Sequence, residues 1–348
     1  PAGRPHTRIE AHSDFARSAV FSPDREQREI LSAGADGLAR IWDRKTGKLR
    51  RELLGHALWV NSAVYSQDGG QVVTAGMDCT ARVWDLRSES DPSVLRSADG
   101  CHDWIRYAEF SPDGQSVVMA SGDSTAYVFA KRAEGWKLAS KLVHPRDSRE
   151  VASAVFSRDG REILTASADH RARRWRLSDG QILQTLDHES DDWVRHAVFS
   201  PQGTMLLTAS RNGLAMLWDV ASGELRSKQA LRTLSGHTGW VRHAVFSADG
   251  RRVVTAGADM AARVWETASG AELLVLNGHS GQLSTAEFSR DGRYVVTAGR
   301  DGVVLVHAID PGLLWTYGCT LLASLPGHPQ TRSDEIATIL ARCRAKKD

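Results

Sequence analysis

The sequence lacks any apolar run of the ~18 to 20 residues that a membrane-spanning helix needs, and it has no signal-like start. Cysteine is scarce: the four residues Cys79, Cys101, Cys319 and Cys343 form no paired CxxC motif. This usage predicts reduced thiols in a cytosolic protein, without a disulfide framework or a zinc site. Neither sign of charge is in excess, because 44 Lys and Arg stand against 42 Asp and Glu. That balance argues against membrane adhesion or non-specific DNA packaging as the main task.

What the sequence has in abundance is an internal repeat. The motif Ala-Val-Phe-Ser, or a close variant, occurs seven times among the 348 residues. Its aromatic residues are separated by 42 to 47 positions and are Phe21, Tyr65, Phe110, Phe156, Phe199, Phe246 and Phe288. A fixed period of this length is typical of repeat architectures and not of two unrelated domains.

Each copy contains the pattern of four short strands. The apolar segment that ends in Phe-Ser runs into a polar turn such as 112–114, and a second apolar strand such as 253–257 follows. A third strand such as 81–85 and a fourth such as 272–276 complete the copy. Because helical periodicity is absent until the C-terminus, we expect an all-β, seven-bladed β-propeller with four antiparallel strands per blade.

The repeats also carry Gly-His pairs, as at Gly236-His237, and Trp-Asp pairs, as at Trp84-Asp85. With these motifs in register, residues 6–310 resemble a WD40-repeat β-propeller. The repeat sequences are similar to the WD40 arrays of bacterial multidomain signalling and defence proteins. The repeats start near His12, His56, His102, His144, His188, His237 and His279.

The resemblance implies a hydrogen-bonded tetrad in most blades, running from Trp through Ser/Thr and His to Asp. The complete sets are His12, Ser32, Asp36 and Trp42; His56, Thr74, Asp78 and Trp84; His144, Thr165, Asp169 and Trp175; and His237, Thr255, Asp259 and Trp265. A set that recurs in nearly every copy indicates a structural network, whereas an enzyme needs one such cluster at an open site. We therefore predict a protein that is not an enzyme, with no metal and no cofactor.

Some copies depart from the tetrad. Copy three has Met119 for Thr and Phe129 for Trp, copy five has Asn212 for Asp, and copy seven has His307 for Trp. Blades three and seven are therefore expected to lack a complete network and to be softer, unless Phe129 compensates by apolar packing. A basic cluster at 171–176 on the third strand of copy four indicates either a contact site or, with better support, a distorted blade edge.

Two columns of residues precede the first strand of each copy, and the resemblance places them on the top face around the central channel. With the position before the tetrad Asp, they give the candidate partner-binding residues Phe15, Arg17, Trp59, Trp104, Arg106, Trp193, Arg195, Arg211, Trp240, Arg242 and Arg300. Trp and Arg together are typical of interaction hot spots. Packing of the Trp side chains beneath neighbouring loops is the alternative. The columns also predict a gap at blade four (Glu150, Ala152) and at blade seven (Gln282, Ser284).

The ends of the chain bear on ring closure. Residues 6–11 match a fourth strand and are expected to complete blade seven, but the strand-like segment 320–325 is a rival for that place. Residues 311–348 form a C-terminal extension in which an amphipathic helix is expected at about 333–345.

These features predict a non-catalytic protein or peptide interaction platform, or a sensor, in the cytoplasm, whose partner is protein or peptide and acidic. By resemblance it would be the recognition part of a larger bacterial signalling or defence protein, with the effector domain in the same parent chain. The alternative function is binding of nucleic acid or a nucleotide phosphate through the top-face Trp and Arg side chains. The low net charge disfavours that alternative.

Overall fold

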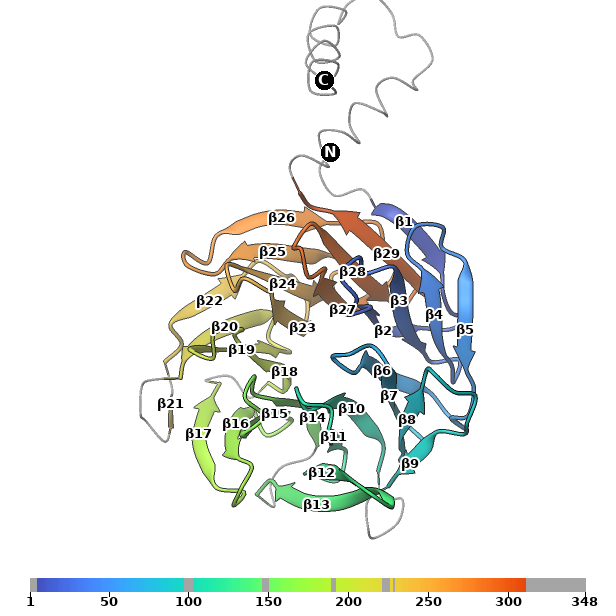
Figure 1. The fold of residues 1–348 in the computed structure, drawn as a ribbon. Coiled ribbons are helices and arrows are strands. Elements are labelled where there is room, and N and C mark those ends of the chain that lie inside the picture. Colours follow the sequence, from blue (N-terminus) through green and yellow to red (C-terminus); the bar gives the residue numbers. More distant parts are fainter. Residues whose placement is uncertain are drawn as a thin grey trace, which may run out of the picture.

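Seven antiparallel sheets surround a central axis as blades (Figure 1). The computed structural model describes residues 5–96, 103–145, 150–188, 192–220, 226–227 and 229–310. Four antiparallel strands build each blade, so the prediction of an all-β, seven-bladed propeller is confirmed. None of the described residues forms a helix long and apolar enough to span a membrane. The C-terminal helix predicted at about 333–345 lies outside the described residues.

The two inner strands of each blade come from the most apolar part of each repeat. The innermost strands, which surround the channel, are β2 (Ala16–Phe21), β6 (Val60–Tyr65), β10 (Ile105–Phe110), β14 (Val151–Phe156), β18 (Val194–Phe199), β23 (Val241–Phe246) and β27 (Leu283–Phe288). The second strands are β3 (Glu29–Gly34), β7 (Gln71–Gly76), β11 (Ser116–Ser121), β15 (Glu162–Ser167), β19 (Met205–Ser210), β24 (Arg252–Gly257) and β28 (Tyr294–Gly299). Every second strand is buried at all but its first residue, because neighbouring blades cover both of its faces.

The outer half of each blade is more polar. The third strands are β4 (Ala39–Asp43), β8 (Ala81–Asp85), β12 (Thr125–Arg132), β16 (Arg171–Arg176), β20 (Leu214–Asp219), β25 (Ala262–Glu266) and β29 (Val303–Ala308). The outermost strands are β5 (Leu49–Leu53), β9 (Ser93–Leu95), β13 (Gly135–Val143), β17 (Ile182–Asp187), β22 (Arg232–Ser235), β26 (Glu272–Leu276) and β1 (Pro5–Glu10). A two-residue strand, β21 (Arg226–Ser227), adds in parallel to β17.

A recurring turn joins the first strand to the second. In blade six, Ser247 Oγ donates to Asp249 Oδ1 at 2.6 Å, and Gly250 N donates to Ser247 O at 2.8 Å. Gly250 has a φ of 72°, a conformation that glycine adopts without strain. The polar turn that follows Phe-Ser in the sequence therefore fixes the hairpin locally.

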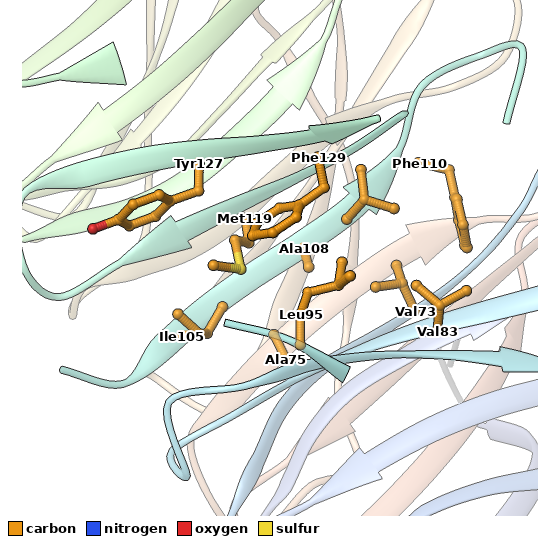
Figure 2. Close-up of a cluster of buried hydrophobic side chains, with 12 residues drawn as sticks. Val73, Ala75, Val83, Leu95, Ile105, Ala108, Phe110, Met119, Tyr127 and Phe129 are labelled. Atoms are coloured by element: carbon orange, nitrogen blue, oxygen red, sulfur yellow. The ribbon is translucent and has the colours of Figure 1, made fainter. Parts of the chain in front are cut away.

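The hydrophobic core lies between blades. Figure 2 shows the cluster between blades two and three, where Val73 and Leu95 face Ile105 and Phe110. Met119 and Phe129, which replace the usual Thr and Trp, are both buried in this cluster. Phe129 therefore fills the Trp position of blade three by apolar packing.

The N-terminal segment closes the ring. Strand β1 pairs antiparallel with β29, so blade seven is assembled from both ends of the propeller (Figure 1). This pairing confirms the expected N-terminal closure and removes the exposed edge that β29 would otherwise present. The rival segment 320–325 lies outside the described residues.

One cysteine expectation is wrong. Cys79 is disulfide-bonded and is therefore not a reduced thiol. The other three cysteines of the sequence lie outside the described residues. The irregular cysteine spacing led to a wrong prediction, because a single disulfide requires only that two cysteines lie close in space and leaves no sequence pattern.

Candidate functional site

A chain of hydrogen bonds runs through blade six. Trp265 Nε1 donates to Thr255 Oγ1 at 2.9 Å, and His237 Nε2 lies 2.7 Å from the same hydroxyl. His237 Nδ1 lies 2.8 Å from Asp259. Burial lowers the pKa of His237, so the neutral ring donates to Asp259 and accepts from Thr255. Equivalent chains join His12, Ser32, Asp36 and Trp42 in blade one and His56, Thr74, Asp78 and Trp84 in blade two.

An arginine on the third strand is a fifth member of this network. In blade one, Arg40 Nη1 lies 2.6 Å from Asp36 and 2.8 Å from His12 Nδ1. Arg82 and Arg263 approach the corresponding aspartates of blades two and six at 3.6 and 3.4 Å. The tetrad pattern expected from the sequence did not include these arginines, although the recurrent Ala-Arg pair before the Trp is a signal for them.

In blade four, an arginine lies between the histidine and the aspartate of the network. His144 Nε2 lies 2.9 Å from Thr165 Oγ1, which also accepts from Trp175 Nε1 at 2.8 Å. His144 Nδ1 is 2.9 Å from Arg173, whose second terminal nitrogen is 2.6 Å from Asp169. Burial, together with Arg173, lowers the pKa of His144 to about 3. The neutral ring therefore accepts from Arg173 at Nδ1, and the guanidinium links His144 to Asp169.

Blade seven is complete, and the prediction that it lacks a full network is wrong. His279 contacts Asp301 at 3.0 Å and Thr297 at 2.9 Å, as in the regular blades. His307 Nε2 lies 3.2 Å from Thr297 Oγ1, in the place of the indole nitrogen. A histidine can replace Trp here because its ring also presents an N–H donor.

The other two irregular blades keep part of the network. In blade three, Tyr127 Oη donates to Asp123 at 2.7 Å, while His102 lies outside the described residues. In blade five, His188 Nε2 lies 3.0 Å from Thr208, but its Nδ1 is buried without a hydrogen-bond partner in the part of the chain that the structure describes. Burial lowers the pKa of His188 to about 4, so this ring is neutral.

In the described residues, the His and Asp side chains of the tetrads take part in structural hydrogen bonds within their blades. Each His–Asp contact described above belongs to a network that ends on a buried Trp or its replacement. Within the described residues, no group of three or more His, Cys, Asp or Glu side chains is placed to hold a metal ion.

The arginines of the basic cluster at 171–176 form ion pairs with carboxylates of the same blade. Arg174 binds Glu162 through two nitrogens at 2.6 and 2.8 Å, and Arg171 pairs with Asp187. Strand β16 pairs regularly with β15, and its register shift beside Trp175 also occurs in blades one and six. The expected distorted blade edge is therefore not observed.

The strongest candidate site is the mouth of the central channel. Each innermost strand has a register shift near its start, with one extra residue opposite the second strand. The extra residues are Arg17, Asn61, Arg106, Ala152, Arg195, Arg242 and Ser284, and all seven line one cavity. A β-bulge re-aims the side chain of its extra residue, so the bulges direct these side chains into the channel.

Trp and Arg side chains stack around this mouth. Arg211 lies between two indoles, 3.7 Å from the ring centroid of Trp193 and 4.1 Å from that of Trp240. Arg106 lies 4.8 Å from Trp104, and Arg17 lies 5.6 Å from Trp59. Arg300 lies 5.2 Å from Phe15 and so joins blade seven to blade one. We call the eleven predicted residues together the Trp/Arg ring.

Blades four and seven, which lack Trp and Arg in the two columns before the first strand, supply acceptors there instead of a gap. Glu150 of blade four is buried and binds Arg106 at 3.0 Å and Arg195 at 3.1 Å. Gln282 of blade seven accepts from Arg242 at 2.6 Å. The expected gap at blades four and seven is therefore filled by side chains that bind the arginines of neighbouring blades.

Burial differs between the two classes of tryptophan. The tetrad tryptophans are buried, whereas Trp59 and Trp240 of the ring are each 38% exposed. Trp104 and Trp193 are half-buried. The ring therefore presents apolar aromatic surface beside guanidinium groups, and packing accounts for only part of its side-chain area.

Three arginines of the ring remain charged at neutral pH although the pKa of each is lowered. Burial, followed by repulsion from neighbouring arginines, lowers the pKa to about 10 for Arg17 and Arg242 and to about 9 for Arg195. Farther along the channel, burial raises the pKa of Glu109 to about 8 and that of Glu287 to about 7. The sequence signal for this acidic pair is the change from Ala-Val to Ala-Glu in copies three and seven, at a position outside the tetrad and ring columns.

The chain belongs to the WD40 family. The family model described as WD domain, G-beta repeat, matches residues 3–43, 47–85, 93–129, 180–219, 228–266 and 270–307. The matches cover more than half of the chain and leave out most of blade four, where Arg173 joins the tetrad.

Individual relatives match only a short stretch. The chain is 33% identical over 58 residues to MST50-interacting protein 11 of Pyricularia oryzae. It is 31% and 32% identical over 58 and 60 residues to the small ribosomal subunit protein RACK1 of Neurospora crassa and of Caenorhabditis elegans. Each match covers 17% of this chain and 18% of the relative, so the chain spans less than a fifth of these curated relatives.

Proposed function

We propose that this protein is a non-catalytic platform that binds a protein or peptide over the channel mouth. The observation that supports this most is the Trp/Arg ring, in which two partly exposed indoles lie beside half-buried, charged arginines. Large aromatic surfaces flanked by guanidinium groups are typical of the energetic centres of protein interfaces. Membership of the WD40 family and the names of the relatives, one of them an interacting protein, agree with such a role.

The preferred partner is acidic. Six arginines belong to the ring, and Glu150 is the carboxylate paired with two of them. An acidic segment would approach this mouth faster and bind it in a defined orientation. We further propose a cytoplasmic recognition unit of a larger bacterial signalling or defence protein, with the effector elsewhere in the parent chain.

Nucleic-acid binding has less support. Base stacking needs open aromatic faces, but Arg211 already covers faces of both Trp193 and Trp240. The balanced net charge of +2 also lacks the basic excess typical of such binders.

Selection of peptides from a random displayed library on the immobilised chain tests the platform. The enriched peptide is then titrated against the wild type and the Trp59→Ala/Trp240→Ala variant. Removal of two partly exposed indoles should weaken binding by at least ~10-fold, because hot-spot truncations cost about 2 kcal/mol or more each.

The matched control is Leu49→Ala/Leu273→Ala, which removes exposed apolar side chains of the outermost strands β5 and β26. We expect this variant to bind as the wild type does. Equal loss in both variants, equal binding by all three proteins, or failure to enrich any peptide would contradict the proposal.

A further inference from the structure

Positive charge at the channel mouth exceeds the negative charge that neutralises it. The four arginines that line the cavity are Arg17, Arg106, Arg195 and Arg242. Within the described residues, Glu150 is the one carboxylate that pairs with any of them. Four guanidinium groups against one ion-paired carboxylate leave an excess of three positive charges among the described groups that line the cavity.

The donors of these arginines are also incompletely used. Each guanidinium carries five N–H donors. Arg17 donates to Asn61 at 2.8 Å and Arg242 to Gln282 at 2.6 Å, and both acceptors are uncharged amides. The Nε atoms of Arg106 and Arg242 are buried and have no hydrogen-bond partner among the described residues. A buried N–H donor without an acceptor costs free energy, so a ligand that accepts hydrogen bonds from these two Nε atoms would be favoured.

The cavity has the size of a small anion. Its volume is about 100 Å³, and its wall includes the buried His196 below the arginines. His196 Nδ1 donates to Ala244 O at 3.1 Å, while its Nε2 has no partner in the described part of the chain. The site is therefore built from side chains fixed by bulges and by neighbouring blades, and not from mobile surface lysines.

We propose that this cavity binds one phosphate group, presented by a phosphorylated side chain of the bound peptide. The inference rests on the proposed platform and specifies the chemistry at its centre. A phosphate dianion matches three uncompensated positive charges better than a single carboxylate does. Its oxygens also accept the paired N–H donors of guanidinium groups in a planar, bidentate geometry.

Calorimetric titration of the full chain at low ionic strength tests the site. The probes are inorganic phosphate, N-acetyl-phosphoserine amide and acetate. The test variant is Arg17→Gln/Arg242→Gln, which removes two charges without leaving a carboxylate unpaired, because both arginines bind amides. The control variant is Arg161→Gln/Arg251→Gln, which removes two exposed charges from equivalent turns of blades four and six.

We expect the wild type and the control to bind both phosphate probes at least ~10-fold more tightly than acetate, and the test variant to lose at least ~10-fold of that affinity. Tighter binding of the phosphoserine amide than of inorganic phosphate supports a peptide source. Equal or weaker binding of the amide refutes the peptide source and assigns the site to free phosphate.

Equal affinity for phosphate and acetate, or equal phosphate binding by wild type and test variant, refutes the anion site. Such a failure is separate from that of the platform, which depends on Trp59 and Trp240. If binding of a selected peptide still requires these indoles, the proposed platform stands although the phosphate site is refuted. Circular dichroism of the test variant shows whether its fold is preserved. Thermal melting of Arg17→Lys/Arg242→Lys, which keeps both charges, provides a second comparison of stability with the wild type.

Discussion

Replacement of Thr255 by Val tests whether the hydrogen bonds of the tetrad stabilise blade six or whether packing alone does. Thr255 Oγ1 is the junction of blade six, where it accepts from Trp265 Nε1 at 2.9 Å and meets His237 Nε2 at 2.7 Å. Valine keeps the shape of the side chain and removes the hydroxyl. Two buried polar groups then lose their partner, each at about 1–3 kcal/mol, so the free energy of unfolding should fall by about 2–6 kcal/mol.

Urea unfolding followed by far-ultraviolet circular dichroism measures this change. Met119→Leu is the matched control, because Met119 holds the equivalent position in blade three and already packs without polar partners. A volume-conserving change there should cost less than about 1.5 kcal/mol. If Thr255→Val unfolds at the wild-type midpoint, the hydrogen-bonded tetrad does not stabilise the blade and its structural role is refuted.

Two further predictions concern blade seven and the carboxyls of Glu109 and Glu287 in the channel. His307→Phe should lower the free energy of unfolding by about 0.5–1.5 kcal/mol in urea, because it removes the donor to Thr297; an unchanged midpoint would show that packing suffices, as with Phe129. Glu109→Gln/Glu287→Gln should raise thermal stability more at pH 8 than at pH 5. The raised folded-state pKa values of about 8 and about 7 mean that the wild type loses stability as pH rises from about 4.5 through them, and a pH-independent effect would contradict this sign.

The fold was predictable because the repeat fixes it locally. Every copy carries its own strand pattern, its Phe-Ser turn and its tetrad residues, so the register of seven motifs locates seven blades. Ring closure also followed, since residues 6–11 match a fourth strand and β1 pairs with β29.

The contacts between blades were not predictable in the same way. Glu150 looked like a gap in its own copy, yet it binds Arg106 and Arg195 from the blades on either side. His307 looked like a lost Trp, because a column of residue types does not show that another ring can donate to Thr297. The bulges that turn Arg17 and its equivalents into the channel depend on strand pairing and have no sequence signature of their own.

The central claim is that partners dock on the Trp/Arg ring, and a crystal structure of the chain with a selected peptide tests it most directly. We predict that the peptide lies across Trp59 and Trp240, with an acidic group against Arg17 and Arg242. A peptide seated on the outermost strands, or in the groove between blades five and six beside Leu231 and Arg251, would contradict the account.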